Sequence, residues 1–200
     1  MNRLELLTKL QELDSAAYPA KTISLLAGSN SPAILVHRLM HAGILCKLKN
    51  GLYAQSGAAP EAVATSILRP SYISFLYALS LHGVSSQNPI QIQVASLKWS
   101  RPVDFAGFQI VFVKTPALAM SDFNPVVRGT KRYFLASPEK ALADCIARPE
   151  MAGLDNIREA WGLLSQRADF DSGKVRTLLA AYQNKRALAR FGRLKREMDG

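Results

Sequence analysis

Two histidines, His37 and His41, stand four residues apart in the segment SPAILVHRLMHAG (31–43), a spacing that would place both imidazoles on one face of a helix. A structural metal site needs about four ligands. No carboxylate lies near the two histidines in the sequence. The nearest thiol, that of Cys46, is expected inside a hairpin and so does not complete the ligand set. We therefore predict no metal there. We also find no Ser-His-Asp spacing and no phosphate-binding glycine loop, so neither catalysis nor a cofactor is expected.

The same segment carries side chains that can bind nucleic acid. At about 100° per residue, its apolar and polar side chains separate onto opposite arcs of a helix. The inward arc holds Pro32, Leu35, Val36, Leu39 and Ala42, and the outward arc holds Asn30, Ile34, His37, Arg38 and His41. No Asp or Glu occurs between Ser15 and Pro60, whereas a merely solvated face normally mixes its charges. A surface without carboxylates suits a phosphate backbone; an ordinary amphipathic helix is the alternative.

A helix and a hairpin are expected to position these side chains. Ser31 is predicted to cap the helix, Pro32 needs no donor in its first turn, and Gly43 ends it. A hairpin then turns at Asn50-Gly51, the dipeptide typical of a type I′ turn. Its two strands are expected at Ile44–Leu48 and Leu52–Gln55.

This order of elements is typical of a winged helix-turn-helix, in which the helix enters the major groove and the hairpin touches the neighbouring backbone. Lys47 and Lys49 alternate with the apolar Cys46 and Leu48, so both lysines should face outward. Asn can address adenine, and Arg38 either guanine or phosphate. The predicted DNA contacts are Ser29, Asn30, Ser31, Ala33, Ile34, His37, Arg38, His41, Lys47, Lys49 and Asn50.

Two earlier helices complete a predicted DNA-binding domain over residues 1–57. Leucines recur at helical spacing in NRLELLTKLQELDS (2–15), and Lys21–Ala27 gives a shorter helix before the turn at Gly28-Ser29-Asn30. The acidic residues of this domain, Glu5, Glu12 and Asp14, belong to the first helix. They are therefore expected away from the contact face.

The composition is that of a folded, basic protein. Of the 200 residues 48% are hydrophobic, and the formal net charge of +10 favours a polyanionic partner. We find no apolar run long enough to span a membrane and no cleavable signal pattern. Cys46 and Cys145 are far apart, and each is expected on an apolar face. A reduced, cytoplasmic protein is the simplest interpretation.

After the small residues of 57–60, the pattern predicts an α+β second domain over residues 60–200 with a small, largely antiparallel sheet. Helices are expected at Pro60–Leu68, Ser71–His82, Ser137–Pro149, Asp155–Ser165, Ser172–Gln183 and Lys185–Met198. Strands are expected at Ile90–Ala95, Val103–Phe105, Phe108–Lys114 and Tyr133–Ala136, with a turn at Ala106-Gly107. Glu139 and Asp144 lie off a common helix face, so both should be solvated or paired with cations.

Three more features could meet a polyanion. Trp99, between Lys98 and Arg101, could stack on bases, but packing at a strand end is preferred. A basic cluster in an expected loop is either solvated surface or a phosphate track; it consists of Arg128, Lys131 and Arg132. In the last helix, apolar residues recur at spacings of three and four, so one face of this helix is expected to pack on the second domain. These residues are Leu188, Phe191, Leu194 and Met198. A basic face should project opposite, either as solvated surface or toward a partner; it consists of Arg186, Arg190, Arg193 and Arg196.

Four segments in this order resemble the abortive-infection antitoxins of the AbiE type. They are ILCKLKNGLYAQ (44–55), SYISFLYALSLHGV (71–84), FLASPEKALADCI (134–146) and RALARFGRL (186–194). The stretch Ser74–Leu79 departs from that family, which more often has polar residues ahead of the Ala-Leu pair. The resemblance implies a repressor of its own operon whose winged helix binds inverted repeats in promoter DNA. It also implies a second domain that counteracts a nucleotidyltransferase-like toxin, without requiring a stable complex.

Other functions fit the residues alone. One is a plain winged-helix transcriptional regulator whose second domain senses a small ligand, which an adjacent toxin gene would distinguish from an antitoxin. Another is an RNA-binding module, which is less favoured because the major groove of A-form RNA is too narrow for a helix. The expected partners are therefore double-stranded operator DNA and a cognate toxin, with no membrane.

Overall fold

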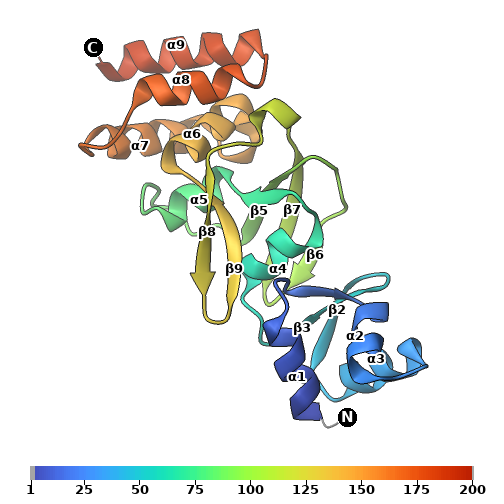
Figure 1. The fold of residues 1–200 in the computed structure, drawn as a ribbon. Helices are drawn as coiled ribbons and strands as arrows, with labels where there is room; N and C mark the ends of the chain where they lie inside the picture. Colours follow the sequence, from blue (N-terminus) through green and yellow to red (C-terminus); the bar gives the residue numbers. More distant parts are fainter. Residues whose placement is uncertain (1–2, 200) are drawn as a thin grey trace.

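The computed structural model describes residues 3–199 and shows a mixed α+β fold (Figure 1). The N-terminal part is built from three helices and a three-stranded antiparallel sheet with the order β1-β3-β2. Its elements are α1 (Arg3–Glu12), β1 (Ala17–Pro19), α2 (Ala20–Ala27), α3 (Pro32–His41), β2 (Leu45–Lys49) and β3 (Leu52–Gln55). This small antiparallel sheet is separate from the one that the sequence predicts for residues 60–200.

The remaining chain forms a six-stranded sheet with helices packed on it. Its order is β6-β7-β5-β4-β9-β8, and the pairs β5–β7 and β4–β9 are parallel while the others are antiparallel. The strands are β4 (Ser71–Ile73), β5 (Gln91–Ser96), β6 (Val103–Phe105), β7 (Phe108–Lys114), β8 (Phe123–Arg128) and β9 (Lys131–Ala136). The sheet is therefore larger and more mixed than the sequence pattern indicated.

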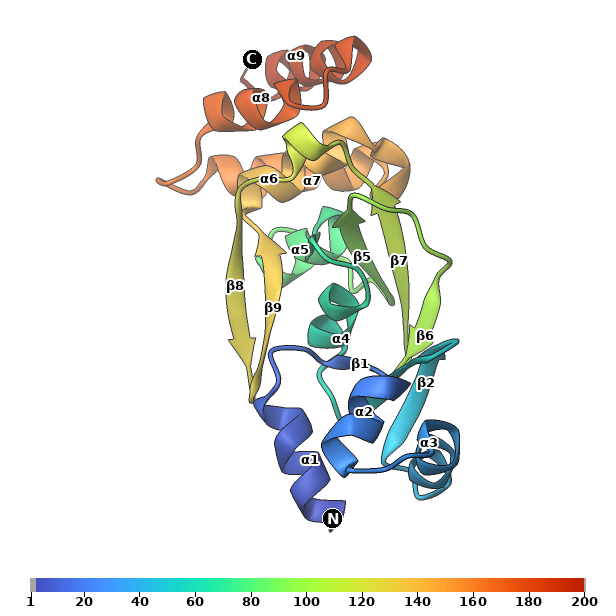
Figure 2. The same ribbon diagram turned by 45° about the vertical axis from the view of Figure 1, so that its right-hand side comes forward.

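Six helices and two short 3-10 turns complete this part. The helices are α4 (Pro60–Ile67), α5 (Phe75–Leu81), α6 (Pro138–Ala147), α7 (Leu154–Ser165), α8 (Ser172–Ala180) and α9 (Lys185–Asp199), and the 3-10 turns are η1 (Ala117–Ala119) and η2 (Pro149–Met151). Ser137 caps α6 as predicted, since its side-chain oxygen accepts a hydrogen bond from the Lys140 N–H. Helices α6 to α9 gather at the end of the sheet far from α1–α3 (Figures 1 and 2).

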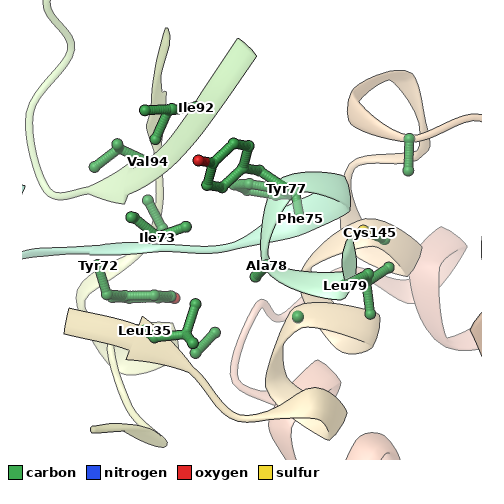
Figure 3. Packing of buried hydrophobic residues seen from close by; sticks show 14 of the residues in the cluster. Tyr72, Ile73, Phe75, Tyr77, Ala78, Leu79, Ile92, Val94, Leu135 and Cys145 are labelled. Carbon is green, nitrogen blue, oxygen red and sulfur yellow. The ribbon is translucent and has the colours of Figure 1, made fainter. Parts of the chain in front are cut away.

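The expected helix over Ser71–His82 is wrong in its first turn, which is strand β4. All three residues of β4 are buried, and Ile73 pairs with Val94 of β5 on one side and with Leu135 of β9 on the other. A strand buried on both faces has no polar alternation that would distinguish it from a helix. Figure 3 shows Tyr72 and Ile73 between β5 and β9, next to the apolar side chains of α5.

Strand β8 was not predicted either. It contains Pro125 and lies at the edge of the sheet, where a proline is tolerated because no further strand needs its missing N–H. Its antiparallel partner is β9, and the two strands form a hairpin that runs down to α1 (Figure 2). The sequence predicted that Arg128, Lys131 and Arg132 lie in a loop. They belong instead to the β8–β9 hairpin.

Two hydrophobic clusters hold the described residues together. The smaller one lies between α1, α2, α3 and one face of the small sheet and includes Leu10, Ile23 and Val36. The other face of that sheet, through Ala17 and Ala54, belongs to the larger cluster around the six-stranded sheet. The N-terminal part is thus packed against the rest of the chain and not merely tethered to it. No helix within residues 3–199 combines the length and apolar character that crossing a membrane requires.

Candidate nucleic-acid interface

Helix α3 is held between two tight turns. Before it, Gly28 adopts a φ of 62°, and the Ser29 N–H donates to the Ser24 carbonyl at 3.0 Å, which closes the α2–α3 turn. After it, Gly43 adopts a φ of 67°, and the Ile44 N–H donates to the Leu39 carbonyl at 3.0 Å. These turns fix the direction from which α3 leaves the core and enters β2.

Ser31 is the N-cap residue of α3 as predicted, but the expected side-chain hydrogen bond is absent. Its side chain makes no capping hydrogen bond, and its own N–H instead donates to the Ser29 side-chain oxygen at 3.2 Å. The Ser31 backbone, at φ −126° and ψ 79°, still leads into Pro32 at the first helical position, where no donor is needed. The helix therefore begins where the sequence indicated, but without the side-chain hydrogen bond.

The outward arc of α3 faces solvent as predicted. Val36 and Leu39 are buried, whereas the predicted contacts of the arc are exposed, namely Asn30, Ser31, Ala33, Ile34, His37, Arg38 and His41. Ser29 is half-buried in the turn, and Ala42, expected on the inward arc, is exposed. The rings of His37 and His41 lie 4.4 Å apart between centroids. The helix thus presents an exposed ridge that is polar apart from Ala33 and Ile34.

The β2–β3 hairpin places Lys47, Lys49 and Asn50 in solvent, but not by simple alternation. The strand register shifts between Lys47 and Lys49, so Leu48 is buried while Cys46 and Lys47 are both exposed. The expectation that Cys46 lies on an apolar face is therefore wrong; its thiol lies 3.3 Å from the Ser56 hydroxyl. The type I′ turn is also wrong, because only Gly51 of the turn pair has a positive φ.

The segment 16–59, which forms α3 and the hairpin, contains no Asp or Glu, and it places the cations Arg38, Lys47 and Lys49 in solvent. Glu5 pairs with Lys9 along α1, and Asp14 pairs with Arg132 of β9, so these carboxylates are engaged elsewhere. Within residues 3–199, no ion pair includes Arg38, Lys47 or Lys49. We call this surface the α3–hairpin face. Its charge is available to a phosphate backbone.

The β8–β9 hairpin joins this part to the rest through buried and exposed contacts. The Lys131 ammonium donates to the carbonyls of Leu10, Gln11 and Leu13 at 2.9, 2.8 and 2.6 Å, and so caps the C-terminal end of α1. Burial lowers the pKa of Lys131. The hydrogen bond from Arg132 holds the pKa of Asp14 below its ordinary value. We call these contacts the α1 strap.

The third cation of the basic cluster is also paired. Arg128 forms an ion pair with Glu61 of α4, a buried carboxylate that additionally accepts a hydrogen bond from the Tyr77 hydroxyl at 3.0 Å. Arg128 and Arg132 therefore form ion pairs within the molecule while their side chains remain exposed, and Lys131 is buried. The cluster is thus more than solvated surface, and its interpretation as a phosphate track stays a prediction.

A second group of ionisable side chains is closed to solvent. Lys140 and Asp144 of α6 are both fully buried and form an ion pair. The Asp144 carboxylate also accepts hydrogen bonds from the hydroxyls of Ser74, Tyr182 and Tyr72 at 2.6, 2.7 and 3.1 Å. Burial, and next the charge of Asp144, raises the pKa of both tyrosines. Asp144 is thus paired as expected but not solvated, and the group is a structural network.

Two more expectations about basic surface are corrected. Trp99 is 66% exposed, so it does not pack at the end of β5, and its neighbours Lys98 and Arg101 are exposed as well. Arg190 does not project with the other arginines of α9, because its guanidinium donates to the Ile146 carbonyl of α6. The exposed arginines of that helix are Arg186, Arg193 and Arg196, and Met198 is 37% exposed, with its terminal methyl group beside Gly162 of α7.

Comparison with known proteins gives a likeness of fold. No protein-family model matches the chain, and no curated protein matches it. Among solved structures, the crystal structure of the RV2827C protein from Mycobacterium tuberculosis is similar, with a TM-score of 0.64 and 18% sequence identity. The match covers 96% of this chain and 75% of that one. At this identity the likeness concerns the mixed α+β architecture alone.

Proposed function

We propose that the chain is an antitoxin that also represses its own operon, with residues 1–57 acting as a winged helix-turn-helix. The main support for DNA binding is the α3–hairpin face. Its polar side chains are exposed, and the segment that forms it contains no Asp or Glu. In this arrangement α3 enters the major groove and the β2–β3 hairpin is the wing. Lys47 and Lys49 contact phosphates, which adds affinity without sequence information.

Sequence recognition is assigned to the ridge of α3. Asn30, in the turn just before α3, and His37, on the exposed side of the helix, address base edges, and Arg38 contacts guanine or phosphate. The test is an operator footprint with the double variant Asn30→Ala and His37→Ala. Both side chains are exposed, so the fold is retained, and we expect discrimination between the operator and random duplex to be lost. A double variant that still protects the same promoter site would refute this assignment.

The antitoxin half is assigned to residues 60–200. It is supported by the resemblance of four segments to AbiE-type antitoxins and by the basic character of the C-terminal helices. The test is co-expression with the product of the neighbouring gene, expected to be a nucleotidyltransferase-like toxin. Growth rescue by the full chain supports the antitoxin function. Absence of a toxin gene next to this one would count against it.

A ligand-sensing regulator is the second candidate, favoured by one cavity. A space of about 520 Å³ lies where the N-terminal part meets the β8–β9 hairpin. It is lined by Gln11 and Gln55 on one side and by Arg128, Thr130 and Lys131 on the other. Because the α1 strap borders this space, a ligand there could change how the two parts pack. Operator binding that responds to a metabolite, with no toxin encoded nearby, would favour this candidate.

A further inference from the structure

Residues 97–102, which join β5 to β6, expose an aromatic ring that does not pack into either hydrophobic cluster. Trp99 is 66% exposed, although tryptophan is usually largely buried. Its ring stacks on no other aromatic ring among the described residues, whereas Trp161, the second tryptophan, is buried against Phe170 and Phe191. Tryptophan is enriched at interfaces, because its ring offers apolar area and its N–H a hydrogen-bond donor. We call residues 97–102 the tryptophan loop.

The backbone of the tryptophan loop is held at both ends. Where the loop begins, the hydroxyl of the buried Ser96 donates to the Lys98 carbonyl at 2.6 Å. The Ser96 carbonyl in turn accepts a hydrogen bond from the Thr115 N–H at 2.8 Å. Where the loop ends, the ring of Pro102 restricts the chain just before β6. A fixed backbone presents the exposed side chains, which lowers the conformational entropy that binding would cost.

Cations flank the exposed ring. Lys98 and Arg101 are exposed, and neither forms an ion pair with a side chain that the structure describes. Lys114 is exposed at the end of β7, opposite the end of β5 where the loop begins. Between positions 85 and 121 the sequence contains one acidic residue, Asp104. An aromatic ring among cations suits the backbone of a nucleic acid.

The tryptophan loop continues the α3–hairpin face. Strand β6, which follows the loop, lies against β2 of the hairpin. Leu48 of β2 and Val103 and Phe105 of β6 are buried in one hydrophobic cluster, which fixes the hairpin relative to the loop. Both ribbon views place α3, the β2–β3 turn and the connection between β5 and β6 along the same side of the molecule (Figures 1 and 2). A duplex that binds α3 and the hairpin can therefore reach the loop as well.

We propose that the tryptophan loop is a second contact with the operator duplex, on the far side of the hairpin from α3. This inference rests on the proposed DNA-binding function. Lys98 and Arg101 pair with phosphates, and Trp99 lays its ring against the sugar–phosphate backbone and donates its indole N–H to it. These contacts add affinity without sequence information, and they extend the footprint beyond residues 1–57. Continuity with the α3–hairpin face favours a duplex over a single strand, on whose bases an exposed ring could also stack.

Trp99 itself is the probe of the first experiment, because the chain contains two tryptophans and Trp161 is buried. Acrylamide quenching of the full chain is compared with that of Trp99→Phe, so the difference reports the exposure of Trp99. The DNA is the region directly upstream of the chain's own gene, as a duplex of about 30 base pairs, or roughly three helical turns. We expect this duplex to protect Trp99 from acrylamide and to leave Trp161 unchanged. A random duplex of the same length should also protect Trp99 at low salt.

The second experiment measures duplex binding against salt for variants of the full chain. Lys98→Ala with Arg101→Ala removes two phosphate contacts and should reduce the log–log salt slope by about two units. Arg186→Ala with Arg193→Ala removes the same charge from exposed positions of α9, at the end of the molecule far from α1–α3, and is the matched control (Figure 2). Its slope should stay close to that of the wild type. Trp99→Ala should weaken binding about fivefold, as expected for one lost hydrogen bond, without changing the slope. Melting temperatures check the fold of each variant.

The outcomes separate the two proposals. A wild-type chain that binds neither its upstream DNA nor a random duplex refutes the DNA-binding function itself. A wild type that binds, while Trp99 stays open to acrylamide and the loss of Lys98 and Arg101 leaves the slope unchanged, overturns the loop assignment and leaves DNA binding standing. Protection of Trp99 by a single strand at lower concentration than by the duplex also overturns it. Protection that grows with protein concentration in the absence of DNA does the same, because the loop would then join two copies of the chain.

Discussion

Replacing Asp144 with alanine is expected to destabilise the fold severely. Asp144 and Lys140 are fully buried on α6, and the carboxylate accepts hydrogen bonds from the Lys140 ammonium and from the hydroxyls of Ser74, Tyr72 and Tyr182. Alanine would leave the ammonium without an anion and the hydroxyls of Ser74 and Tyr182 without their acceptor, while the Tyr72 hydroxyl would keep the Ala119 carbonyl. Removing one partner of such a buried pair costs about 3–5 kcal/mol, a large part of the roughly 5–15 kcal/mol that holds a typical domain.

A double variant separates the charge from the packing. Lys140→Met with Asp144→Leu keeps apolar volume and removes both charges, and such replacements are often neutral or stabilising. The hydroxyls of Tyr182 and Ser74 would still lose their acceptor, at about 1 kcal/mol each. We therefore expect the double variant to be more stable than Asp144→Ala by about 2 kcal/mol.

Urea unfolding followed by circular dichroism measures the differences in the free energy of unfolding, and thermal unfolding measures the melting temperatures. Asp144→Ala should lower the melting temperature by about 6–20 °C, and the double variant clearly less. A loss below about 1 kcal/mol for Asp144→Ala would show that the Lys140 ammonium finds water or another partner. Equal losses in the single and double variants would show that packing, and not the unpaired charge, determines the cost.

Three further outcomes are expected. Lys131→Met, which removes three hydrogen bonds to the end of α1, should lower the free energy of unfolding by about 2 kcal/mol, and an unchanged urea midpoint would contradict the α1 strap. Lys47→Ala with Lys49→Ala should reduce the log–log salt slope of duplex binding by about two units, and an unchanged slope would mean that the hairpin does not touch DNA. Burial raises the pKa of Tyr18 to about 12, so the neutral phenol is favoured in the folded state. This contribution to stability is complete below about pH 10 and is lost as pH rises through about 12, which phenolate absorbance compared with Tyr18→Phe would detect.

Local patterns in the sequence were enough to predict most helices and the exposed ridge of α3. The apolar period of 31–43 predicted that Val36 and Leu39 would be buried and that His37 and Arg38 would be exposed, because helical phase depends only on spacing along one element. The turn at Ala106-Gly107 and the Ser137 cap were predicted for the same reason. These features depend on residues within a few positions of one another.

The positions that sequence reasoning misjudged are those whose surroundings come from distant segments. Strand β4 exists because β5 and β9 pair with it on both sides, and three buried residues show no period of their own. The register shift in β2 exposes Cys46, which a strict alternation would bury. No spacing rule within a single element predicts either outcome.

The fate of polar side chains was decided by tertiary structure in the same way. Lys131 meets the end of α1 some 120 positions earlier in the chain, and Asp144 meets Ser74 and Tyr182 from two other segments. From the sequence alone, a charged residue in a basic or amphipathic stretch is predicted to be exposed, because its partners from distant segments are not known. A buried charge persists only where such partners converge on it. The sequence alone thus determined most helices and the exposed side of α3, and the tertiary structure decided where β4 and β8 form and which charges are paired within the fold.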